Sequence, residues 1–159
     1  MEHSELIENA FVNYLTGLGP PSPWSAGLLI LPGENNLDKD GARIVAYVPR
    51  DGGMGEEDPP TSGNRWADPV IELRTPFFQR TPAQIKAGVP DPLAAHQANA
   101  AALQSAILSN QLPDLLTAAI EGFTCWGVAE RQPMREQESH FWASGWRVRL
   151  LSCPASFPA

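Results

Sequence analysis

The chain has 159 residues, of which 43% are hydrophobic and 18% are charged, and its formal net charge is −7. The length is sufficient for one hydrophobic core and the composition is that of a globular protein, which argues against a disordered chain and against two domains. Because no lysine- or arginine-rich block is present, the chain lacks the cations that drive tight binding to DNA.

The sequence also bears on the compartment in which the chain folds. No apolar run reaches the roughly 20 residues that cross a bilayer, and the acidic start at residues 1–5 does not resemble a secretory signal. Two cysteines, Cys125 and Cys153, are too few for a disulfide framework, so both are expected to be reduced, packed thiols. We therefore expect a protein that folds in a reducing cytosol and has no membrane partner.

The N-terminal third is predicted to contain a helix and two strands. Apolar residues recur at helical spacing over 6–18, with Ser4 as the expected N-cap. The short apolar run 28–31 and the β-branched run 43–48 are both typical of strands. A polar turn at 34–41 separates these runs, so they are expected to form a hairpin.

Two long loops are predicted in the middle of the chain. Glycine and proline over 49–66 favour neither a helix nor a strand. The run 70–74 then alternates as a half-exposed strand does, and an irregular passage at 75–91 follows, with the aromatic pair Phe77 and Phe78 near its start. Loops of this length are uncommon in a compact domain and are usually functional or mobile.

The C-terminal half is predicted to be a helical region followed by two strands. Asp91 as N-cap and Pro92 at the first helical position begin an alanine-rich helix over 93–108, and a short helical segment is expected at 113–122. Strands at 123–131 and 139–152 flank an expected turn at 132–136. In the last strand, alternate residues share one face: Trp142, Trp146, Val148 and Leu150.

This order of elements predicts an α+β fold in a single domain spanning 1–159. Its mainly antiparallel sheet of about four to five strands is packed by an N-terminal helix and one longer central helix.

The sequence contains only partial matches to the motifs that bind metals or phosphate. The stretch 36–41 places oxygen ligands as a calcium loop does, but its twelfth position is Tyr47 rather than a glutamate, which favours an ordinary turn. The glycines at 52, 53 and 55 lack the lysine-serine ending of a phosphate loop. His3, His96 and His140 do not have metal-ligand spacing. We predict no metal site and no cofactor.

The sequence also lacks a complete motif for nucleophilic or redox catalysis. Cys125 has no Cys-x-x-Cys partner, and no serine occupies a Gly-x-Ser-x-Gly elbow. Neighbouring acids such as Glu56 and Glu57 fall in polar loops, where charge usually serves solvation. No catalytic residue is therefore predicted, and the chain is expected not to be an enzyme.

The aromatic content points to contacts between proteins. The chain has five tryptophans, a residue that is enriched where proteins meet, although core packing is the alternative for any one of them. The candidate interface residues combine loop aromatics with residues around the C-terminal hairpin: Trp66, Phe77, Phe78, Arg80, Arg131, Met134, Arg135 and Trp142.

The order of elements resembles that of the tail terminator, or tail completion, proteins of long-tailed bacteriophages. The resemblance lies in the opening helix 5–18, the strand ending in 71–74, the helix 93–108 with its extension to Gly122, and the strands 126–131 and 141–151. It covers nearly the whole chain, and its most familiar part is the C-terminal hairpin, where 129–134 leads through a polar turn to 146–150. The two long loops and the tryptophan density depart from the family pattern.

The resemblance implies a structural virion protein. Its subunits would form a hexameric ring at the head-proximal end of the tail tube, end tube growth, and contact the tail tube protein and the neck or connector protein. The ring requires two different contact faces on each subunit. An acidic lumen would let DNA pass without specific binding.

Two other readings stay open. One is a neck or head-completion protein or another tail-tube subunit, which keeps the structural class. The other is a small cytosolic enzyme or ligand-binding domain, which would require a deep pocket with perturbed titratable groups.

Overall fold

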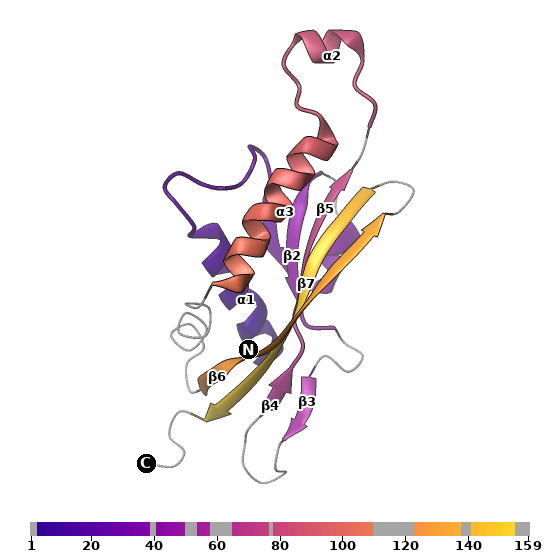
Figure 1. Cartoon of the computed structure of the whole chain (residues 1–159). Coiled ribbons are helices and arrows are strands. Elements are labelled where there is room, and N and C mark those ends of the chain that lie inside the picture. The colour runs from indigo at the N-terminus through magenta and orange to yellow at the C-terminus, as the bar shows by residue number, and fades with distance from the viewer. Residues whose placement is uncertain are drawn as a thin grey trace.

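The fold consists of one twisted sheet with two helices on one face and a small helical arm projecting beyond it (Figure 1). The structure is a computed structural model and describes residues 3–38, 41–49, 54–57, 65–76, 78–109, 123–137 and 141–154. For residues 3, 54–57, 65–66, 123–137 and 150–154 it describes the backbone alone.

The sheet of the described residues has seven strands, more than the four to five that we expected. Its path runs β1-β2-β5-β7-β4-β3, and β6 pairs with the other side of β7. Their bounds are β1 Leu29–Pro32, β2 Arg43–Tyr47, β3 Met54–Glu57, β4 Arg65–Ala67, β5 Val70–Pro76, β6 Phe123–Gln137 and β7 Phe141–Pro154. The α+β class is confirmed, but the sheet is mixed, because β1 and β2 run parallel while the other pairs are antiparallel.

The expected hairpin between the first two strands is wrong, and the connection between them explains why. It contains a 3-10 helix, η1 Glu34–Asp38, and returns the chain to the level at which β1 began, so that Leu29 pairs with Arg43. The buried Arg43 guanidinium donates hydrogen bonds to the carbonyls of Leu37 (Nε to O, 2.9 Å) and Gly41 (Nη1 to O, 2.7 Å). Leu37 also packs on the sheet face away from the helices, against Val45, Tyr47 and Val70.

Two helices cover the opposite face of the sheet and enclose the main core. Helix α1 His3–Thr16 lies over β1 and β2, and helix α3 Pro92–Leu108 lies over β5 and β7. Because α1 begins at His3, the expected cap Ser4 lies inside the helix. The core is formed by alternate strand residues and by one face of each helix, including Ile7, Phe11, Leu15, Ile44, Ile71, Leu73, Leu103, Ile107 and Val148.

The C-terminal hairpin is longer than expected. The predicted turn at 132–136 lies within β6, which extends to Gln137. Pro133 is paired with Trp146 but β6 is an edge strand in the described sheet, and proline is tolerated there because its missing N–H faces away from the partner strand. The short helix predicted at 113–122 lies outside the described residues.

Both predicted loops contain regular structure. The segment 49–66 includes β3 and the start of β4, which pair with each other and join β7 through β4. The segment 75–91 includes the end of β5 and a five-residue helix, α2 Pro82–Lys86. Glycine and proline were therefore weaker signals than the pairing of these segments with the rest of the sheet.

Candidate interaction surface

The arm is defined as residues 78–91, which connect β5 to α3 and project from the end of the sheet with α2 at the tip (Figure 1). Local sequence explains how α2 forms. Thr81 accepts a hydrogen bond from the Gln84 N–H (3.2 Å), and the Gln84 side chain accepts one from the Thr81 N–H (2.9 Å), which makes a complete capping box. Gly88, with φ of +82°, then lets the chain turn back after the helix.

The two legs of the arm are joined by a side chain. Arg80 in the first leg donates a hydrogen bond from Nη1 to the Val89 carbonyl in the second leg (3.0 Å). At the base of the second leg, Asp91 caps α3 by accepting a bond from the Leu93 N–H (3.4 Å). The arm therefore has its own internal hydrogen bonds as well as a fixed attachment to α3.

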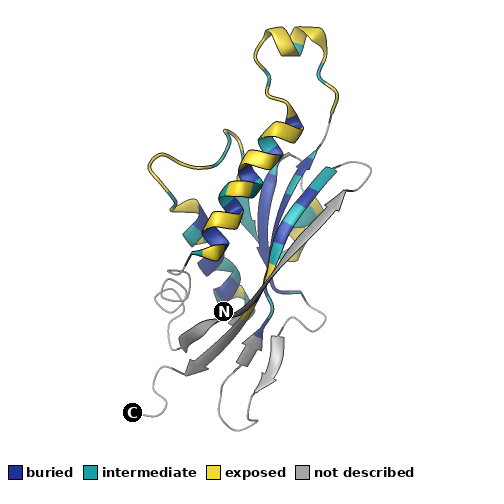
Figure 2. Ribbon diagram, in the orientation of Figure 1, coloured by how far each residue is buried: buried dark blue, intermediate teal, exposed yellow. Residues whose placement is uncertain are grey.

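The arm contributes little to the core of its own molecule. None of the residues of α2 is buried, and the apolar side chains of Phe78 and Ile85 are 47% and 54% exposed. Figure 2 shows this contrast, because the arm is coloured as exposed along nearly its whole length while the sheet below it is buried. An ordered segment that presents large apolar side chains to solvent is typical of a site that binds another protein.

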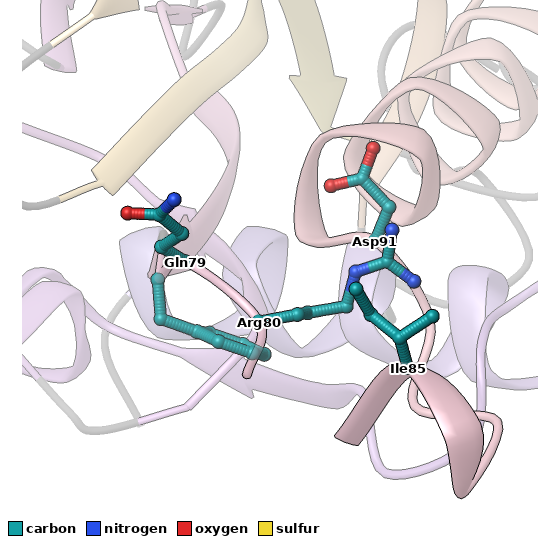
Figure 3. A pocket seen from close by; sticks show the side chains of 5 residues that line it. Gln79, Arg80, Ile85 and Asp91 are labelled. Atoms are coloured by element: carbon teal, nitrogen blue, oxygen red, sulfur yellow. The ribbon is translucent and has the colours of Figure 1, made fainter. Parts of the chain in front are cut away.

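An open hollow of about 520 Å³ lies against the arm. It is lined by Phe78, Gln79, Arg80, Ile85 and Asp91. Figure 3 shows the Arg80 side chain extending across it toward Ile85 and Asp91, while Gln79 lies on the other side. The hollow thus combines apolar walls with one cation and one carboxylate.

The outer face of α3 continues from the base of the arm and has an unusual composition. Residues 92–108 include no lysine, arginine, aspartate or glutamate. The outer face is therefore made of small, amide and apolar side chains, all exposed: Leu93, Ala94, Gln97, Ala98, Ala101, Gln104, Ser105 and Leu108. Ordinary solvent-facing helices carry charged residues on this side, so this face resembles one that is covered by another protein.

The inner face of α3 carries a buried polar cluster that links the helix to the sheet. His96 Nδ1 is 2.8 Å from Thr75 Oγ1 on β5, and His96 Nε2 is 2.8 Å from Ser144 Oγ on β7. Burial lowers the pKa of His96 below its ordinary value of 6.5, which favours the neutral ring. The pair of His96 and Ser144 resembles a base and its nucleophile, but the imidazole is only 5% exposed, and its second nitrogen is bonded to a hydroxyl rather than to a carboxylate. The two hydrogen bonds of His96 therefore position α3 on strands β5 and β7.

A second polar contact fixes the segment that follows α1. Asn99 is 1% exposed, and its side chain accepts a bond from the Ser25 N–H (3.0 Å) and donates one to Ser25 Oγ (2.9 Å). The Trp24 indole donates to the Leu15 carbonyl (2.9 Å), and Trp24 packs against the core. These contacts satisfy buried polar groups and leave the outer face of α3 open.

The predicted interface residues that the structure describes are distributed over the arm and three strands, β4, β6 and β7. Phe78 and Arg80 lie together in the arm and line the same hollow. Trp66 is in β4, and Trp142 is a half-buried residue of β7 opposite Thr75. Backbone pairing places Arg131, Met134 and Arg135 in β6, opposite Val148, Gly145 and Ser144, and Phe77 lies outside the described residues.

Sequence reasoning missed the other members of this surface. Ile85 and Asp91 line the hollow, but the sequence assigned no contact role to either of them. The outer face of α3 was also missed, because the helix was recognised by its N-cap, its first proline and its alanine content. The available signal was the absence of charge over 92–108 in a chain that is 18% charged.

The fold and this surface define a single-sheet α+β protein with a projecting helical arm. Within the described part of the chain, no cluster of histidine, cysteine, aspartate or glutamate could hold a metal ion, and no helix is long and apolar enough to cross a membrane. A scan against protein-family models gives no match to the chain, and a search of curated proteins gives none either.

Proposed function

We propose that this chain is a structural virion protein of a long-tailed bacteriophage, the tail terminator. In this role its copies form a hexameric ring at the head-proximal end of the tail tube, end the growth of the tube, and provide the joint to the neck. Such a protein acts through the binding free energy of complementary surfaces on neighbouring chains, and it has no catalytic role.

The observation that carries the proposal is the arm. It has its own capping box and its own link between the two legs, yet α2 buries none of its residues and Phe78 and Ile85 face solvent. Ordering such a segment costs conformational entropy, and this cost is offset only where the segment contacts something else. A ring of identical subunits offers that contact, because a heterologous interface joins two different faces of the same chain.

The order of elements gives further support. Helix α1, strand β5, helix α3 and the β6–β7 hairpin occur in an order that resembles that of the tail terminator family. The strands belong to one sheet, and the two helices cover it. The net charge of −7 suits a ring through which DNA passes, since like charge discourages adhesion to the lumen.

Electron microscopy of the protein bound to tails tests the proposal. Tails that lack this protein, purified from the virus that encodes the chain, would be mixed with gold-labelled protein and imaged by negative staining. We expect one label cluster at one end of each tube and a mean tube length that no longer increases when more tube protein is added. Label on capsid portals would identify a neck or head-completion protein instead, while label along the tube, or none, would refute the proposed role.

A further inference from the structure

We infer that the arm of one copy binds the uncharged outer face of α3 in a second copy of this chain. The inference rests on the self-assembly in the proposed function, but it does not depend on where in a virion the assembly lies. It assigns both halves of the subunit contact to described residues.

The arm is suited to be the inserted element of this contact. Its apolar side chains, Phe78 and Ile85, are exposed, and they flank the hollow that also contains Arg80 and Asp91. The arm is attached at the N-terminal end of α3 and points away from the sheet, so it does not cover α3 of its own molecule (Figures 1 and 2). Its legs, residues 78–81 and 87–91, can extend up to roughly 14 and 17 Å. Such a projection is suited to reach a neighbour.

The outer face of α3 is suited to be the receiving surface. This face is composed of alanine, glutamine, serine and leucine, and its ends carry the exposed Leu93 (37%) and Leu108 (44%). Alanine side chains let another backbone approach closely, whereas the leucines at either end offer apolar contact to Phe78 and Ile85. Because no charged group of α3 would have to lose its water, covering this face has little electrostatic cost.

Charge favours a second copy of the chain as the occupant. The whole chain has a formal net charge of −7, so two copies repel each other over most of their surfaces. The arm does not share this negative charge, because its charged residues are Arg80, Lys86 and Asp91. Helix α3 has no charged residue. The arm and α3 are therefore a region where two copies meet without like-charge repulsion.

The size of the region suits one of the repeated contacts of a closed ring rather than a single isolated dimer interface. Residues 78–108 include nineteen exposed residues, eleven in the arm and eight on α3. A single contact therefore joins the eleven exposed residues of one arm to the eight of one α3, which is fewer than the roughly 20–30 residues on each side of a standard interface. In a closed ring each copy uses its arm toward one neighbour and its α3 toward the other, so the arm and α3 contribute to two separate contacts of modest size, which together hold each subunit.

Photo-crosslinking identifies the contact directly. The photoreactive residue p-benzoylphenylalanine replaces Ile85, and a mixture of nitrogen-15-labelled and unlabelled protein is irradiated, both free in solution and bound to tails. Mass spectrometry of the peptides then separates crosslinks between copies, which contain one labelled and one unlabelled peptide, from crosslinks within a copy. We expect crosslinks between copies from position 85 to residues 92–108, and the reciprocal crosslinks to the arm when the photoreactive residue replaces Ala98.

A pair of charge variants tests the same contact by affinity. The variant Ala98→Glu places a carboxylate at the middle of the outer face of α3, and Asn13→Glu adds the same charge at an exposed position of α1. We expect Ala98→Glu to weaken self-association by roughly 10- to 100-fold, since a charge buried without a partner opposes binding, while Asn13→Glu leaves association near that of the unmodified chain. Both sites are exposed in the single copy, so both variants are expected to fold.

The outcomes separate this inference from the proposed function. Crosslinks from position 85 that reach only another arm, another element or the tube protein would overturn the inference, and so would equal effects of the two glutamate variants or a lack of self-association in both samples. A ring at the tail end without crosslinks between arm and α3 would overturn the inference alone. Crosslinks between arm and α3 without a ring at the tail end would overturn the proposed role alone.

Discussion

The substitution Gly145→Ala is expected to destabilise the fold more than its size suggests. Gly145 lies in β7 directly opposite Glu72 of β5, and a Cβ atom at this position would come within 2.9 Å of the Glu72 Cα and would meet the Ile71 carbonyl oxygen. Real Cβ atoms do not approach other heavy atoms so closely. Because both groups belong to the backbone of a neighbouring central strand, no side-chain rotation relieves the contact.

The magnitude follows from two opposing effects. Overpacking of a well-packed site costs about 1–3 kcal/mol, and a clash with backbone belongs at the upper end of that range. Replacing glycine by alanine also restricts the unfolded chain, which offsets about 0.4–1 kcal/mol. The expected net loss in the free energy of unfolding is therefore about 2 kcal/mol, which corresponds to a decrease in Tm of roughly 4–8 °C for a chain of this length.

Urea denaturation followed by tryptophan fluorescence measures this loss, with Gly88→Ala as the control. Gly88 has a φ of +82° and open space around its Cα, so alanine there meets no clash. The left-handed backbone costs about 1–2 kcal/mol, and the same restriction of the unfolded chain offsets part of it, which leaves a net loss of about 1 kcal/mol. If Gly145→Ala proves no more destabilising than Gly88→Ala, then β5 and β7 do not approach each other as described, and the steric reasoning is refuted.

Three further substitutions or conditions test other parts of the structure. Because the pKa of His96 is lowered in the fold, the unfolded chain binds more protons at this site below pH 6.5. The contribution of His96 to stability is therefore complete above that pH and falls below it by at most about 1.4 kcal/mol per pH unit; urea titrations of the parent and of His96→Asn check this, and an unchanged slope in the variant contradicts it. Arg43→Met leaves the carbonyls of Leu37 and Gly41 without their guanidinium donor and should cost about 1–3 kcal/mol by the same assay, whereas a neutral effect would show that η1 is held by other contacts. Arg80→Ala should leave Tm unchanged, because the arm lies outside the core, but should accelerate cleavage by trypsin after Lys86; equal cleavage rates would mean that Arg80 does not hold the legs together.

The α+β class and the main helices could be predicted because their signals are local. Apolar residues at helical spacing indicated α1, and Asp91 with Pro92 located the start of α3 correctly. The cap at Asp91 is a contact between residues two apart in the chain, which is the range in which sequence patterns are informative.

The parts that could not be predicted depend on contacts between distant segments. The polar stretch after Pro32 reads as a hairpin turn, but the direction of the chain there is decided by the burial of Arg43 and by Leu37 packing against the sheet. Similarly, Pro133 reads as the end of a strand, yet it is accommodated because β6 is an edge of the sheet. Neither the burial of an arginine nor the position of a strand at an edge is visible in local sequence.

The candidate surface was predicted only in part for the same reason. Phe78 and Arg80 were recognised by residue type, and the structure places them in one arm. The contacts of His96 were not predicted, because its partners Thr75 and Ser144 come from two separate strands. Residue type identifies single members of such clusters, but the cluster itself is a property of the fold.

The placement of β7 has a consequence for synthesis of the protein on the ribosome. This strand occupies the middle of the sheet, where it pairs with β5 and β4 on one side and with β6 on the other. Until Phe141–Pro154 has been translated and has left the exit tunnel, β5 has an unpaired edge and α3 lacks half of the surface that it covers. The nascent chain therefore exposes the edge of β5 from the time that β5 leaves the tunnel until β7 follows it, and folding is completed after translation of β7 rather than progressively from the N-terminus.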